Sequence, residues 1–375
     1  MIKQSDIISL FLQPERVLEF TPAQLSKVIV VLRQQKILAR MCCRIQQAGV
    51  FEQLDEQSQR HFLNAKHIAD RQREQVLNEA QDLVKTLDLV AEYLIFLKGA
   101  AYSMCGGVVG EGRIYSDIDI LVPQKDIKAC EKRLIINGWY GDEISDYDDK
   151  YYRKWAHEIP PMTHGRRGTI IDIHHNIVPL ISKSSLNVDL LLEHKEEIAP
   201  GIYVLSASAQ LVHAAIHLFR NEDYIGSFRD LTDLYLMLES QDLEFYLQSI
   251  ALAKQVGFLP ELKLAIRYVH RLLGLDVPCE ASKQLYQQDN IKQWANDAIF
   301  TKVLLPQHSL MKGTSTPILH GLAAIRGHIL KMPLHILIYH LSVKASRAIL
   351  ESIFGAHIFT PTDPSRPTPK QKQDI

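Results

Sequence analysis

Apolar positions recur at helical spacing through the first part of the chain, from residue 1 to about residue 88. Thr21-Pro22-Ala23-Gln24 supplies an N-cap, a proline at the first helical position and a capping-box glutamine. Leu25 and Val28 then fall on one helical face. A second long helix is predicted from near Asp55 to Leu87, with its polar face toward solvent. We therefore expect an N-terminal helical region over residues 1–88.

The pattern changes between residues 89 and 205, where short apolar runs alternate with helical segments. Runs of apolar β-formers predict strands over residues 93–97, 116–122 and 169–174. Helices are predicted over residues 100–105 and 125–137, separated by a glycine-rich loop over 106–112. This alternation of strands and helices indicates a small mixed sheet.

Helical periodicity resumes at Ser206 and continues to about residue 355, and a proline-rich tail covers residues 356–375. The sequence thus predicts an α+β fold in which a sheet core over 89–205 is flanked by helical regions over 1–88 and 206–355.

Composition narrows the functional class. The 375 residues carry a formal charge of -1, so the sequence gives no strong signal for a nucleic-acid partner. The five cysteines include no C-x-x-C pair, which argues against a disulfide framework and suits a reducing compartment. The most apolar late segment, Met332–Val343, falls short of the roughly 20 residues of a membrane span. We see no signal peptide, and we expect a soluble, cytoplasmic protein.

The most informative residues are carboxylates set among β-formers. Ser116-Asp117-Ile118-Asp119 is predicted to place Asp117 and Asp119 on one face of a strand, because side chains alternate between faces. Two adjacent carboxylates repel each other unless a cation lies between them, and Mg²⁺ or Mn²⁺ is the natural choice. Asp172 lies on the third predicted strand and would complete a two-metal site. His174 shares the face of Asp172 and would orient the acid or the acceptor.

A phosphate-binding turn is predicted just upstream of these acids. Lys98-Gly99 ends the first strand, and a backbone without a side chain at Gly99 lets a triphosphate approach closely. The N–H groups that open the next helix favour an anion. Arg113, in the glycine-rich loop, is a candidate triphosphate contact because a guanidinium matches phosphate oxygens. His157 precedes the third strand and is a candidate contact for the acceptor or the phosphates.

These motifs resemble an uncharacterised nucleotidyltransferase family of the polymerase-β-like superfamily. The resemblance rests on Phe96-Leu97-Lys98-Gly99, Arg113, Ser116-Asp117-Ile118-Asp119-Ile120-Leu121-Val122, Ile171-Asp172-Ile173-His174, His213-Ala214-Ala215-Ile216-His217 and the run from Phe228 to Leu234. It implies that Asp117, Asp119 and Asp172 bind the metal and catalyse transfer. It also implies that Lys98, Gly99, Arg113 and Ser116 bind the nucleotide. The sheet core would then be a nucleotidyltransferase core.

The resulting hypothesis is a metal-dependent nucleotidyltransferase. It would transfer a nucleoside monophosphate from an NTP, with ATP the expected donor, to a hydroxyl of an unknown small-molecule or protein acceptor, and would release pyrophosphate. The alternative is an inactive nucleotide-binding or interaction module on the same fold. Ala100 motivates that alternative, because the wider superfamily has Gly-Ser or Gly-Gly at this turn. A third reading is metal-dependent phosphoester hydrolysis without an acceptor.

Overall fold

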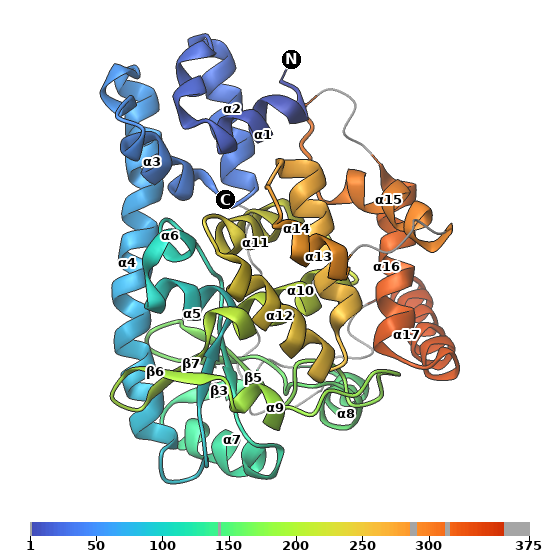
Figure 1. The fold of residues 1–375 in the computed structure, drawn as a ribbon. Coiled ribbons are helices and arrows are strands. Elements are labelled where there is room, and N and C mark those ends of the chain that lie inside the picture. The colour runs from blue at the N-terminus through green and yellow to red at the C-terminus, as the bar shows by residue number, and fades with distance from the viewer. Residues whose placement is uncertain (1, 142–143, 286–290, 312–315, 356–375) are drawn as a thin grey trace.

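A computed structural model describes residues 2–141, 144–285, 291–311 and 316–355. Within these residues one mixed sheet of seven strands forms the centre of the fold, in the order β3-β4-β5-β2-β1-β7-β6 (Figure 1). The strands are β1 (Ile95–Leu97), β2 (Ile118–Leu121), β3 (Trp139–Gly141), β4 (Met162–His164), β5 (Ile170–His174), β6 (Lys195–Ala199) and β7 (Ile202–Leu205). The predicted α+β class with helical flanks is confirmed.

The central strands run in mixed directions. β2 is parallel to β5 and antiparallel to β1, which is parallel to β7. The expected strand over 116–122 begins only at Ile118, so Asp117 lies in the bend before β2 and not on the strand. The pairing ends there because β1 turns into a helix at Lys98, directly after Leu97 pairs with Asp119.

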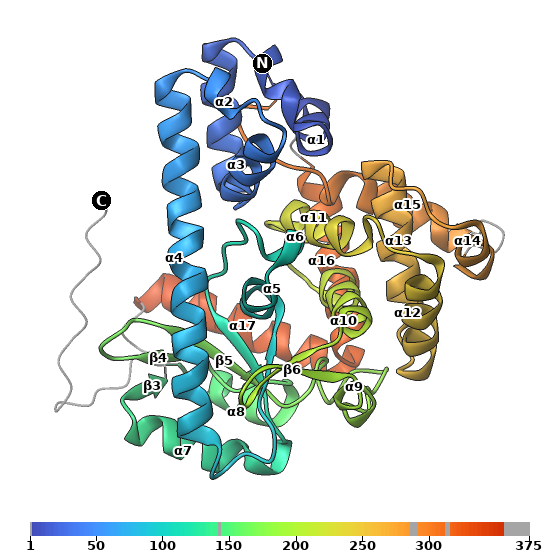
Figure 2. The same cartoon turned by 60° about the vertical axis from the view of Figure 1, so that its left-hand side comes forward.

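The N-terminal helices are α1 (Gln4–Leu12), α2 (Pro22–Gln34), α3 (Leu38–Gln47) and α4 (Glu56–Leu87). The capping box predicted at Thr21 and Gln24 is present, and the Asp55 side chain caps α4 by accepting from the Ser58 N–H. α4 extends from α2 and α3 past the sheet to the neighbourhood of α7 (Ile127–Ile136) (Figure 2). This one helix therefore connects the N-terminal bundle to the sheet core.

The two faces of the sheet pack into separate hydrophobic clusters. Phe96, Ile120 and Ile173 pack with α4 and α7, whereas Leu97 and Leu121 belong to the cluster that includes α10 (Ala207–Arg220). Asp119 pairs with Leu97 and therefore faces α10. The alternation along the strands thus directs this carboxylate toward the C-terminal helices.

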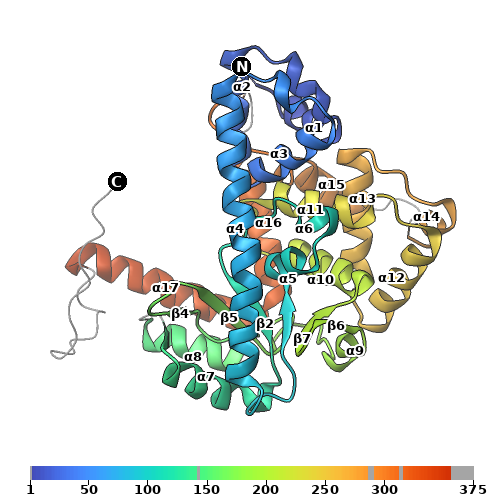
Figure 3. The ribbon, with the colours of Figure 1, turned by 90° about the vertical axis from the view of Figure 1, so that its left-hand side faces the viewer.

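The C-terminal region consists of helices that pack beside the sheet (Figures 1 and 3). They are α10, α11 (Ser227–Leu238), α12 (Leu243–Gln255), α13 (Leu259–Leu273), α14 (Cys279–Leu285), α15 (Ile291–Val303), α16 (Pro317–Lys331) and α17 (Leu334–Phe354). None of the helices in the described residues is long and apolar enough to cross a membrane.

Short elements inside the core differ most from expectation. The glycine-rich loop contains a single helical turn, α6 (Gly107–Gly110), and the helix expected from residue 100, α5 (Lys98–Cys105), begins two residues earlier. The polar segment before β4 forms α8 (Asp146–Trp155). The short helix α9 (Asp189–Leu192) precedes the β6–β7 hairpin. The proline-rich tail predicted over residues 356–375 lies outside the described residues, and the division into four regions stays a prediction.

Candidate active site

Strand register brings two of the predicted acids side by side. Asp119 on β2 lies directly opposite Asp172 on the parallel strand β5. The side chain of Asp117, in the bend before β2, lies close enough to Asp172 for a hydrogen bond when one of the two carboxyl groups is protonated. The three carboxylates that sequence reasoning selected therefore meet at one end of the sheet, two through pairing and one through the bend.

Asp119 is a buried carboxylate with two partners on the same oxygen. Its Oδ1 lies 2.6 Å from Lys98 Nζ and 2.9 Å from His174 Nε2. Burial alone would raise the pKa of Asp119, but Lys98 and His174 outweigh it and hold this pKa well below its usual range. Lys98 is the first residue of α5 and has a positive φ of 50°. In this backbone conformation its side chain forms the ion pair with Asp119. Asp119 is therefore ionised and firmly oriented.

The pKa values of Asp172 and Asp117 are raised, whereas that of Asp119 is lowered. Burial, together with the charges of Asp119 and Asp117, raises the pKa of Asp172 to about 7. Burial and the Asp119 charge also raise the pKa of Asp117. Asp172 Oδ1 is buried and has no hydrogen-bond partner within the described part of the chain. An unpaired carboxylate oxygen among repelling acids is the condition that a hard divalent cation relieves.

The geometry of the donor atoms also fits such an ion. One ligand atom each from Asp119, Asp172 and His174 lies within 4.8 Å of the other two. Carboxylate oxygens are the ligands that Mg²⁺ and Mn²⁺ prefer. The residues present therefore fit a divalent metal, while Lys98 competes with the ion for Asp119.

Glu158 is a residue that sequence reasoning missed. Its Oε2 lies 3.2 Å from His174 Nδ1, so His174 bridges Glu158 and Asp119. The segment before β4 brings Glu158 here by pairing with His174 in an isolated β-bridge. No spacing in the sequence links Glu158 to the acids. His157 lies beside it, with its ring centroid 5.4 Å from that of His174.

The residues predicted to contact the nucleotide do not share one environment in the structure. Arg113 is 6% exposed, and its Nε donates to both carboxylate oxygens of Asp233 on α11, at 3.1 and 2.9 Å. The predicted contact of Arg113 with a triphosphate stays a prediction. Gly99 lies against the same loop, because a Cβ there would come within 3.0 Å of Tyr115 Cβ. Ser116 is exposed and lines a cavity of about 180 Å³ together with Asp117.

A second cavity, of about 250 Å³, lies between the sheet and the C-terminal helices. Its lining includes Lys98, Glu158, Asp172, Ile216, His217 and Lys331. The side of Asp172 that faces the helices therefore borders a space that a small ligand can enter.

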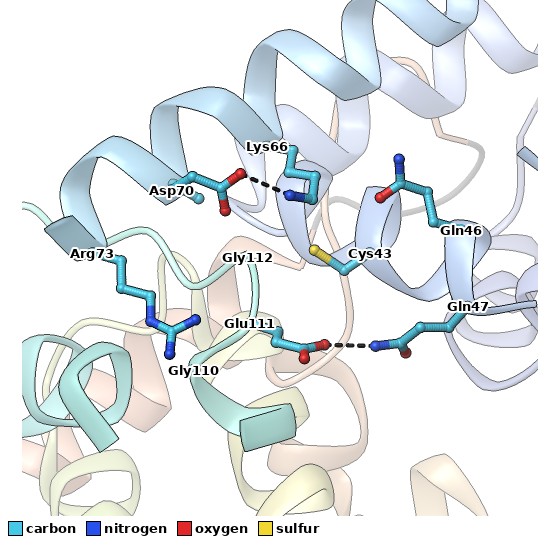
Figure 4. A pocket seen from close by; sticks show the side chains of 10 residues that line it. Cys43, Gln46, Gln47, Lys66, Asp70, Arg73, Gly110, Glu111 and Gly112 are labelled. Atoms are coloured by element: carbon cyan, nitrogen blue, oxygen red, sulfur yellow. Dashed lines mark hydrogen bonds and ion pairs between the residues drawn. The ribbon is translucent and has the colours of Figure 1, made fainter. Parts of the chain in front are cut away.

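A third cavity lies away from these acids, between α3, α4 and the loop at Gly110 (Figure 4). Its polar groups include the Lys66–Asp70 ion pair and a hydrogen bond from Gln47 to Glu111. None of the predicted site residues lines this cavity. The chemistry assigned to the acids therefore does not extend to it.

Comparison with known proteins finds a family match that covers the sheet and the three acids. A model of the uncharacterised nucleotidyltransferase family matches residues 21–274, and the chain belongs to that family. The match includes every strand of the sheet, the three acids and the helices from α2 through α13. No curated protein matches the chain. Membership supports a general role in nucleotidyl transfer, and the resemblance read from the sequence is confirmed.

Proposed function

We propose that the protein transfers a nucleoside monophosphate from an NTP to a hydroxyl group of a small-molecule or protein acceptor and releases pyrophosphate. ATP is the expected donor. The observation that carries this proposal is the in-register pair Asp119–Asp172, placed next to the Lys98-Gly99 turn at the end of β1. Family membership supports the reaction class.

Asp117, Asp119 and Asp172 would hold Mg²⁺ or Mn²⁺. When bound, such an ion neutralises charge on the phosphates and helps to orient them. The unpaired Oδ1 of Asp172 supports this assignment. Lys98 would pair with phosphate oxygens once a nucleotide draws it from Asp119, and Gly99 would leave room at the start of α5. Ser116 and Arg113 are the further proposed nucleotide contacts.

The reaction itself is an in-line displacement at phosphorus. The acceptor oxygen forms a bond to the α-phosphorus while the bond from that phosphorus to the bridging oxygen of pyrophosphate breaks. The hydroxyl proton passes to the Asp172 carboxylate, which borders the 250 Å³ cavity. His174 positions Asp119 through the 2.9 Å contact with its Oδ1.

The test uses ATP labelled at the α-phosphate, Mg²⁺ and a cell extract as the source of acceptor. We expect label to appear on an acceptor, with equimolar pyrophosphate, for the wild-type chain and not for Asp172→Asn. Release of labelled AMP without any labelled acceptor would show hydrolysis and contradict the proposal.

An inactive nucleotide-binding module is the second candidate. It is favoured by the 2.6 Å ion pair between Lys98 and Asp119, which engages the predicted metal ligand, and by Ala100 at the turn. Intact Mg-ATP binding without pyrophosphate release, with extract present, would favour this module over the transferase.

A further inference from the structure

A second group of ligating side chains lies next to the three acids and shares His174 with the group described above. It consists of His157, Glu158 and His174, each of which offers one ligand atom within 4.8 Å of the other two. Glu158 Oε2 lies 3.2 Å from His174 Nδ1 and 3.9 Å from His157 Nε2. Glu158 and His157 also line the 250 Å³ cavity.

His157 has no hydrogen-bond partner for its ring among the described residues. Its Nδ1 is buried and unpaired, and its Nε2 is too far from Glu158 for a hydrogen bond. The His157 side chain is 18% exposed, but its Nδ1 is buried, and buried polar atoms are paired in most native structures. Its Nε2 faces Glu158 Oε2 across 3.9 Å, a separation that suits two ligands of one metal ion.

The backbone holds these residues in place without a metal. The carbonyl of His157 accepts from the N–H groups of His175, at 2.8 Å, and Asn176, at 3.3 Å. The Ile159 N–H donates to the Ile173 carbonyl at 3.0 Å, and Glu158 pairs with His174 in a β-bridge. Two extended segments are therefore joined on both sides of the cluster, which fixes the ligands before any ion arrives.

The ligand types select a particular class of ion. Two imidazoles and one carboxylate suit Zn²⁺ and similar transition metals, whereas Mg²⁺ prefers oxygen ligands. His174 Nε2 contacts Asp119 Oδ1 at 2.9 Å, and its Nδ1 lies 3.2 Å from Glu158 Oε2, a contact that a bound ion would replace. A carboxylate behind a metal-binding histidine is the usual arrangement in zinc sites, because it fixes the tautomer and orients the ring.

We propose that His157, Glu158 and His174 form a binding site for Zn²⁺ or a related transition-metal ion, separate from the magnesium site proposed at the aspartates. Three protein ligands leave at least one tetrahedral position free. Because His157 and Glu158 line the cavity that also borders Asp172, a small oxygen ligand in that cavity can take this position.

The experiment measures zinc binding by the full chain after metal removal, by competition with a chromophoric zinc chelator in excess Mg²⁺. We expect one tightly held zinc per wild-type chain. His157→Gln and Glu158→Gln should each weaken binding by about 100-fold or more, the upper end of effects seen for outer-shell groups. His157→Cys should retain zinc, since a thiolate is also a zinc ligand. Thermal unfolding of each variant confirms that it is folded.

His67→Gln is the matched control, because His67 is an exposed histidine on α4 outside the cluster. Asp117→Asn should leave zinc binding unchanged, so failure of the zinc site and failure of the proposed nucleotide site give different results. Two outcomes would overturn the proposal: no stoichiometric zinc on the wild-type chain, or equal zinc affinity of the wild type, His157→Gln and Glu158→Gln.

Discussion

The buried ion-pair network around Asp233 should make the free energy of unfolding sensitive to the loss of this one negative charge. Asp233 is 3% exposed, and its Oδ1 accepts from Arg40 Nη2 at 2.7 Å. Its carboxylate also accepts from Arg113 Nε. This network joins α3, the loop before β2 and α11. Asp233→Asn would remove the negative charge that both guanidinium groups share.

The expected cost follows from what remains. Arg40 keeps the neutral acceptors Thr232 Oγ1, at 2.8 Å, and the Val109 carbonyl, at 2.9 Å. Arg113 keeps the Ile114 carbonyl, which accepts from its Nη1, and the more distant carboxylate of Asp230, at 3.7 Å. Removing one partner from a buried ion pair costs about 3–5 kcal/mol, because the remaining charge stays buried. We expect the free energy of unfolding to fall by about this amount.

Equilibrium unfolding in urea, followed by tryptophan fluorescence, measures this loss. Asp70→Asn is the matched control, because the Asp70 side chain is 47% exposed in its ion pair with Lys66 and its loss should cost about 1 kcal/mol or less. If Asp233→Asn unfolds within about 1 kcal/mol of the wild type, the network does not stabilise the fold as argued.

Two further changes test the packing and the titration of buried groups. Gly112 has a φ of +63°, and a Cβ there would lie 2.4 Å from the Arg40 backbone nitrogen, so Gly112→Ala should lose more than about 2 kcal/mol in urea unfolding. Gly49→Ala, at a φ of +71° with open space, should lose only about 1–2 kcal/mol, and an equal loss in both would contradict the clash. Burial first, then Lys98 and His217, lower the pKa of His213 well below 6.5. Below pH 6.5 only the unfolded state binds this proton, so stability falls with falling pH by about 1.4 kcal/mol per pH unit for this group. His213→Gln should make the fall between pH 6.5 and 5 shallower by up to that amount in urea titrations, and an unchanged slope would refute the assignment.

The sequence was sufficient to predict that Asp119 and Asp172 lie on strands, but it did not predict all of their surroundings. Asp119 and Asp172 were predictable because each lies among apolar β-formers, and strand register then brings the two together. The strand position of Asp117 was wrong, because the end of pairing at Lys98 depends on where β1 stops and not on local propensity. Glu158 was missed, since an isolated β-bridge leaves no periodic signal in the chain.

Two other features of the structure could not be predicted from the local sequence. Arg113 and Asp233 are 120 positions apart, and nothing local to either residue predicts that they pair. The sequence favoured a phosphate contact for Arg113 because a guanidinium matches phosphate oxygens, and it held no signal for the pairing with Asp233 on α11. The β6–β7 hairpin was not predicted either, because the exposed strand β6 lacks the apolar alternation of the central strands. A cytoplasmic location and the identity of the donor stay predictions.

The most direct test of the central claim is metal-dependent retention of the nucleotide by the acids. Filter binding of radiolabelled ATP should show retention by the wild-type chain with Mg²⁺ or Mn²⁺ and little retention with EDTA. The double variant Asp117→Ala/Asp119→Ala should lose it, while Asp88→Ala, at an exposed position after α4, should retain it. Equal retention by the double variant and the wild type would contradict the account.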